Sequence, residues 1–137
     1  MEAILALFNK FAKAELDVLI LRVGLGLVFL YAGTASLESP TNWVGFVPDF
    51  VGWVVPKETF LTAHSFFELA LGVGLVAGLW TPVLSMLAFL SLFSILIFFG
   101  IDEVTFRDFG LAVMALALFT RVARPRAHAA NQMFGQS

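Results

Sequence analysis

Residues 82–99 read PVLSMLAFLSLFSILIFF and contain no charged side chain. A helix needs about 20 mostly apolar residues to cross the hydrocarbon core of a bilayer, so this stretch predicts a membrane-spanning helix. Working outward, stretches of similar character predict further spanning helices at residues 16–37, 57–80 and 104–120. The sequence has no internal repeat and no low-complexity linker. We therefore expect one domain over residues 1–137, an all-α integral membrane four-helix bundle.

The composition points the same way. The chain is 60% hydrophobic and 13% charged, whereas soluble domains are nearer half apolar and a quarter charged. Its net charge of -2 and the absence of a basic stripe give no reason to expect a nucleic-acid partner. The absence of cysteine excludes disulfides, thiolate zinc sites and cysteine-ligated iron–sulfur clusters. Any redox role would therefore need a bound cofactor or another subunit.

The segments that flank the helices have their own patterns. Apolar residues at helical spacing within residues 1–15 predict an N-terminal amphipathic helix at the membrane surface, rather than a cleaved signal peptide. Residues 121–137 are polar and predict a tail. The aromatic connection at residues 38–56 has partly helical spacing, which Pro48 should break. Its aromatic residues either anchor the segment at the lipid headgroups or form a lid over a binding site.

Lysine and arginine predict the orientation of the chain. One side of the bundle receives the five cations Lys10, Lys13, Arg121, Arg124 and Arg126. The other side receives only Lys57 and Arg107, among several carboxylates. Cytoplasmic loops carry the excess of positive charge. We therefore expect a multi-pass protein of the cell (cytoplasmic) membrane, with both termini in the cytoplasm.

Arg22 is a charged residue within the first predicted span. A charge near the centre of a spanning helix costs about 2.5–3.5 kcal/mol on insertion scales, so such residues usually face the bundle interior. Arg22 shares one helix face with Gly26, Phe29 and Gly33, and the glycines allow a second backbone to approach. Alternatively, Arg22 reaches the cytoplasmic headgroups, because it lies about two turns from the helix start.

Glu68 is the corresponding residue of the second span. His64, Glu68 and Gly72 share a face at successive turns. A capping box from Ser65 to Glu68 would instead start the helix at residue 66, but that helix would have only about 15 residues, so we expect the longer helix and a buried Glu68. Glu68 and His64 are then candidates for proton exchange. They lack a third metal ligand, so we expect no metal site.

The remaining signals concern helix contacts and helix starts. Ala70, Gly74 and Gly78 form a stripe of small residues, which predicts a close contact with a neighbouring helix, a second copy or a partner subunit. Thr81 is the expected N-cap of the third helix, with Pro82 as its first residue.

The start of the fourth helix has two readings. Residues 105–108 match a capping box, which gives Asp108 a structural role in the first turn. Arg107, next to it, could still reach toward Glu68.

Five groups of residues, in their order and spacing, resemble the DoxX family of small four-helix membrane proteins. They are LRVG at 21–24 with FLYAG at 29–33, WVGFVP at 43–48, FELALG at 67–72, GLWT at 78–81 and FRDFGL at 106–111. The resemblance implies binding residues at Arg22, Glu68, Arg107 and Asp108. It also suggests likeness to the small subunit of a thiosulfate:quinone oxidoreductase. Two positions depart from the family pattern: Ser36 replaces a common lysine, and Pro82 replaces a common arginine.

Three functions follow as hypotheses. The first is a DoxX-like membrane subunit of a quinone-linked oxidoreductase complex, with a quinone or small-substrate site near Glu68 and no catalysis by this chain alone. The second is a non-catalytic anchor or assembly subunit for a partner enzyme. The third is a small proton- or cation-coupled transporter. The expected partners are the lipid bilayer and either further copies of the chain or redox subunits. The candidate cofactor is a quinone that is not covalently bound.

Overall fold

The computed structural model describes residues 1–6 and 16–124, in which every regular element is a helix. The four long helices are α2 (Leu16–Glu38), α4 (Lys57–Ala77), α5 (Thr81–Phe99) and α6 (Glu103–Ala123). They confirm the four predicted helices to within a few residues. Residues 2–6 are helical, but most of the predicted surface helix and nearly all of the predicted tail lie outside the described residues. Residues 121–123 continue α6 and do not belong to a tail.

Three of these helices, α2, α4 and α5, are long and apolar enough to cross a membrane. Helix α6 has 21 residues, as many as α4. It differs in charge, because Arg107 and Asp108 fall in every 18-residue stretch of it, together with either Glu103 or Arg121. The number of charges, and not the length, therefore distinguishes α6 from the other three.

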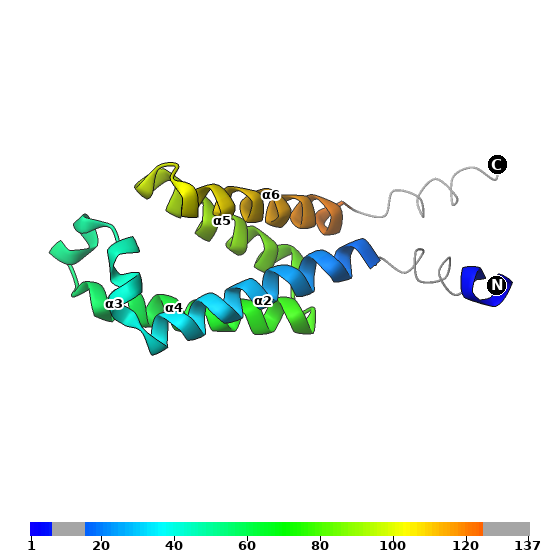
Figure 1. The fold of residues 1–137 in the computed structure, drawn as a ribbon, viewed down its shortest axis with the longest axis horizontal. Coiled ribbons are helices and arrows are strands. Elements are labelled where there is room, and N and C mark those ends of the chain that lie inside the picture. The colour runs from blue at the N-terminus through cyan, green and yellow to red at the C-terminus, as the bar shows by residue number, and fades with distance from the viewer. Residues whose placement is uncertain (7–15, 125–137) are drawn as a thin grey trace, which may run out of the picture.

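The long helices pack as two pairs, α2 with α4 and α5 with α6, and the pairs meet through α2 with α6 and α4 with α5 (Figure 1). Helix α2 begins and α6 ends at the same end of the molecule, which we call the terminal end (Figure 1). There the Arg121 Nε donates a hydrogen bond of 2.9 Å to the Asp17 carboxylate. The opposite end, where α2 ends and α6 begins, is called the loop end.

The backbones of α2 and α4 are in direct contact at glycines. A Cβ atom on Gly26 would lie 2.9 Å from the carbonyl oxygen of Gly72, and a Cβ on Gly72 would lie 2.8 Å from the carbonyl oxygen of Gly26. Nearer the loop end, a Cβ on Gly33 would lie 2.9 Å from the carbonyl oxygen of Ser65. The prediction that the glycine face of α2 receives another backbone is confirmed.

The turn between α4 and α5 corrects two predictions. Helix α4 ends at Ala77, because Gly78 adopts a left-handed φ of 78° and caps the helix. The stripe of small residues therefore does not continue to Gly78, while Gly74 packs against Leu84 of α5. The N-cap of α5 is Trp80, also left-handed with φ 40°, so the predicted Thr81 cap is wrong. This short turn reverses the chain through left-handed backbone and not through a threonine cap.

The capping box of α6 also lies elsewhere than predicted. Asp102 is the N-cap, and its carboxylate accepts hydrogen bonds from the backbone N–H groups of Val104 and Thr105. Thr105, predicted as the cap, is the third helical residue, and its hydroxyl accepts a bond from the Asp102 N–H. Asp108 is therefore not in the first turn. Asp102 is the cap because its extended backbone lets its carboxylate accept from the free N–H groups of the first helical turn.

The connection between α2 and α4 is built from short helical pieces. These are α3 (Pro40–Trp43), η1 (Val44–Phe46) and η2 (Asp49–Trp53). Pro48, with ψ 143°, separates η1 from η2, so the predicted break is confirmed. The Phe46 and Phe50 rings lie with their centroids 5.8 and 5.2 Å from those of Phe99 and Phe98. The connection therefore folds over the end of α5.

Candidate functional site

Glu68 lies near the middle of α4 and is only 8% exposed. The helix begins at Lys57, so the alternative in which Ser65 starts the helix is excluded. Ser65 instead lies inside α4, where its hydroxyl donates to the Leu61 carbonyl oxygen at 2.7 Å. The expected long helix and buried Glu68 are confirmed. A carboxylate at this depth requires polar neighbours.

His64 is the nearest such neighbour and lies one turn before Glu68 on the same helix. Its Nε2 is 3.5 Å from the Glu68 Oε1. The imidazole stacks on the ring of Phe60, with centroids 6.0 Å apart, and also contacts Phe67 at 5.8 Å. His64 is more exposed than Glu68. The pair therefore connects a buried carboxylate to the surface of the helix, an arrangement suited to passing a proton.

Helix α6 brings a second carboxylate toward this pair. Asp108 is 15% exposed at its side chain, and the charges that act on it are those of Arg107, Asp102 and, least of the three, Glu68. The Arg107 Nε lies 3.9 Å from the Asp108 Oδ1, and the arginine side chain is 70% exposed. Arg107 therefore pairs with Asp108, and it makes no ion pair with Glu68. Three of the four residues predicted to bind a substrate (Glu68, Arg107 and Asp108) form one electrostatic group, which we call the Glu68 cluster, together with His64.

Arg22 lies elsewhere. Its guanidinium packs against Gly78 at the terminal end, ten residues beyond Glu68 on the chain, or about 15 Å along a helix axis. The buried Nε of Arg22 makes no hydrogen bond with any described residue. A cation at this position faces the C-terminus of α4, where the helix dipole is negative. The structure therefore gives Arg22 a place at the end of a helix and not in the Glu68 cluster.

A buried pair of hydroxyl groups was not anticipated as a contact. The Ser36 and Ser65 oxygens lie 2.6 Å apart, and both residues are buried between α2 and α4. Since Ser65 donates to Leu61, Ser36 can donate to Ser65. The spacing was a usable signal, because Ser36 continues the face of Gly33 by one turn.

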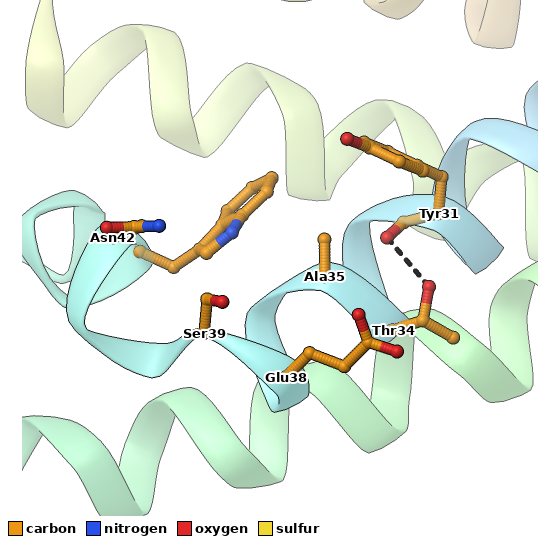
Figure 2. A pocket seen from close by; sticks show the side chains of 7 residues that line it. Tyr31, Thr34, Ala35, Glu38, Ser39 and Asn42 are labelled. Atoms are coloured by element: carbon orange, nitrogen blue, oxygen red, sulfur yellow. Dashed lines mark hydrogen bonds between the residues drawn. The ribbon is translucent and has the colours of Figure 1, made fainter.

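A depression of about 300 Å³ at the loop end was also missed. It is lined by Tyr31, Thr34, Ala35 and Glu38 of α2 and by Ser39, Asn42 and Trp43 beyond its end (Figure 2). Its residues are spaced by three and four along one face of α2 and continue into α3. That spacing was available in the sequence, but the bend at Ser39 that closes the depression was not. No residue of the Glu68 cluster lines it.

Comparison with known families gives one match. The family model described as DoxX matches residues 18–100, which is more than half of the chain. The matched region runs through α2, α4 and α5 and includes Arg22, His64 and Glu68. It ends before Arg107 and Asp108. Searches of curated proteins and of solved structures gave no match.

Proposed function

The chain belongs to the DoxX family, and on that premise we propose that it is a membrane subunit of a quinone-linked oxidoreductase complex. In this proposal all four long helices cross the cell membrane, with both termini in the cytoplasm. The excess of lysine and arginine near the two termini supports this orientation. The common location of the start of α2 and the end of α6 supports an even number of crossings (Figure 1).

The proposal requires α6 to span the membrane despite its charges. Its 21 residues give about 32 Å of helix, which matches a hydrocarbon core of about 30 Å. The charges lie toward its two ends, with Glu103, Arg107 and Asp108 at the loop end and Arg121 at the terminal end. Between them, residues 109–120 carry no charge. Buried residues at three-residue spacing hold this stretch inside the bundle: they are Ala112, Ala115 and Leu118.

The proposal of a quinone site rests mainly on the buried carboxylate of Glu68. A quinone is an apolar ring with two carbonyl oxygens, and on reduction it takes up two electrons and two protons. The exposed rings of Phe60 and Phe67 offer an apolar surface beside His64. His64, or Glu68 when protonated, can donate a hydrogen bond to a carbonyl oxygen. The donor set and its apolar surroundings therefore fit a quinone headgroup.

The side chains have distinct roles in this proposal. Glu68 and His64 hold and exchange a proton near the quinone oxygen. Asp108 keeps Arg107 near the loop end of the cluster, and the arginine offsets negative charge there. The described side chains supply protons and charge but not electrons, so the electrons come from a partner subunit.

Replacement of Glu68 by glutamine tests the proposal. The purified chain in mild detergent would be titrated with a short-chain quinone such as decylubiquinone. We expect Glu68→Gln to weaken binding by about tenfold, because the imidazole that donates to the quinone oxygen loses its charged partner when the carboxylate becomes a neutral amide. Glu103→Gln is the matched control, since Glu103 is exposed in the first turn of α6. Equal affinity of wild type and Glu68→Gln, or no binding by either, would contradict the proposed site.

Mass spectrometry of the gently extracted complex tests the subunit role separately. We expect a redox partner chain and bound quinone to be recovered together. A stable partner without quinone would support the assembly alternative instead. The structure leaves less contact surface for that alternative than the sequence indicated, because Gly74 and Gly78 are occupied by Leu84 and Arg22 of the same chain.

A further inference from the structure

The depression at the loop end of α2 has a negatively charged lining. Glu38 is its one charged residue, and the lining contains no lysine, arginine or histidine. Among residues 1–6 and 16–124, Glu38 makes no ion pair. An anionic ligand would therefore meet repulsion here, whereas a cation would find an unpaired carboxylate.

Three polar side chains line the depression together with that carboxylate. The Ser39 hydroxyl makes no capping bond to α3, although Ser39 is the N-cap. The Thr34 hydroxyl donates to the backbone of its own helix, at 2.8 Å to the Leu30 oxygen, and so faces a ligand as an acceptor. Asn42 adds a side-chain carbonyl oxygen. A ligand that carries positive charge and N–H or O–H donors can satisfy the carboxylate, the Thr34 hydroxyl and the amide oxygen together.

Aromatic rings supply the rest of the wall. Trp43 is held by Phe46, with ring centroids 6.0 Å apart, and Phe46 is held in turn by Phe99 of α5 at 5.8 Å. The indole is therefore positioned before a ligand arrives. Indole and phenol rings attract cations within about 6 Å. In Figure 2 the small side chain of Ala35 lies between those of Tyr31, Glu38 and Ser39, so no large side chain fills the centre of the lining.

The position of the depression at the end of a predicted spanning helix indicates the source of the cation. Helix α2 is long and apolar enough to span a membrane, and it ends at Glu38. Tyrosine and tryptophan at the end of such a helix lie at the level of the lipid headgroups. We propose that this depression binds a primary ammonium group, presented by the headgroup of an ethanolamine phospholipid. The acceptors select a primary over a quaternary ammonium, because a quaternary nitrogen has no N–H. The inference does not depend on the quinone proposal.

Three lipids with the same acyl chains test the site. The purified full-length chain in mild detergent would be titrated with dioleoyl phosphatidylethanolamine, phosphatidylcholine or phosphatidylglycerol, and retained lipid measured by native mass spectrometry. We expect about tenfold tighter retention of the ethanolamine lipid than of either other lipid, because the choline nitrogen has no N–H donor and the glycerol headgroup has no positive charge. Glu38→Gln should abolish this preference. Glu58→Gln, which changes an exposed carboxylate in the first turn of α4 outside the depression, should preserve it.

A second arm separates the two sources of the ammonium group. Water-soluble glycerophosphoethanolamine has the headgroup without the acyl chains. If it displaces the lipid only at a large excess, the ligand is the membrane lipid; if it competes at equal concentration, the ligand is a soluble amine, which overturns the lipid assignment. Equal retention of the three lipids by wild type would overturn the site itself. A preference that survives Glu38→Gln would do the same. Both carboxylate variants change exposed side chains, and circular dichroism would verify their helix content.

Discussion

At the scale of single residues, the surroundings of Glu68 decide what it can do. Its carboxylate is buried in the middle of α4, its neighbour His64 is more exposed, and the charge of a second carboxylate, that of Asp108 on α6, acts weakly on the same region. A buried charge without partners is costly, so the Glu68 carboxylate depends on the His64 imidazole beside it. Arg22 contributes nothing to this balance, because it lies at the far end of α4.

The placement of Arg22 leads to a prediction that separates it from the cluster. Arg22→Gln removes a cation from the C-terminus of α4. It should lower the free energy of unfolding by about 0.3–1 kcal/mol, the usual size of a helix-dipole interaction, while the affinity for decylubiquinone stays unchanged. Thermal unfolding in detergent and the quinone titration measure the two effects. A loss of quinone affinity with unchanged stability would contradict this placement and show that Arg22 contributes to quinone binding.

Asp102 gives a prediction about pH. The backbone N–H of Thr105, followed by that of Val104, holds the pKa of Asp102 below its ordinary value of 3.8. A folded pKa that is lowered stabilises the fold above the unfolded value, and this contribution is lost as pH falls through the folded pKa. Asp102→Asn keeps a capping oxygen but cannot titrate. Its midpoint of unfolding should therefore fall less than that of wild type as the pH is lowered below 3.8. Parallel curves for the two proteins would contradict this assignment.

At the scale of helices, the contact between α2 and α4 rests on the absence of side chains at Gly26 and Gly72. This contact also sets the register, so that Glu68 lies one turn from the level of Gly26 and Ser65 is level with Gly33. The face of α2 could be predicted from its 3.6-residue period. The register could not, because periodicity gives the direction of a side chain around an axis but not its height against a neighbour.

A pair of glycine substitutions tests this contact. In Gly72→Ala the new Cβ would lie 2.8 Å from the Gly26 carbonyl oxygen, so the helices must separate. We expect a loss of about 1–3 kcal/mol in the free energy of unfolding, as for other overpacked sites. In Gly24→Ala the new Cβ meets nothing within 4 Å, and the higher helix propensity of alanine should leave stability unchanged or slightly raised. Equal losses in the two variants, measured by thermal unfolding in detergent, would contradict the close contact.

Helix ends were harder to predict than helices. The long apolar stretches located all four helices, because hydropathy adds up over many residues. The ends depend on single residues in competition: Gly78 ended α4 where hydrophobic residues continued, and Asp102 capped α6 in place of Thr105. Both glycine and aspartate are strong local signals, and each outweighed the pattern around it.

At the scale of the whole molecule, the sequence indicated which side chains belong inside but not which meet. Glu68, His64 and Asp108 could be identified as polar residues of predicted spanning helices. Their grouping, and the exclusion of Arg22 from it, depends on how the pair α2–α4 sits against the pair α5–α6 (Figure 1). The depression beside Glu38 was invisible for a similar reason, since it forms only where α2 bends into α3.

The account depends most on the claim that α6, the most charged of the long helices, crosses the membrane. The chain has no cysteine, so single cysteines report accessibility without background. Ile101→Cys lies in the turn before α6 and Arg124→Cys lies just after its end. In right-side-out membrane vesicles, an impermeant maleimide should label position 101 at once and position 124 only after permeabilisation. Labelling of both positions under the same condition would contradict a spanning α6 and, with it, the proposed four-helix membrane subunit.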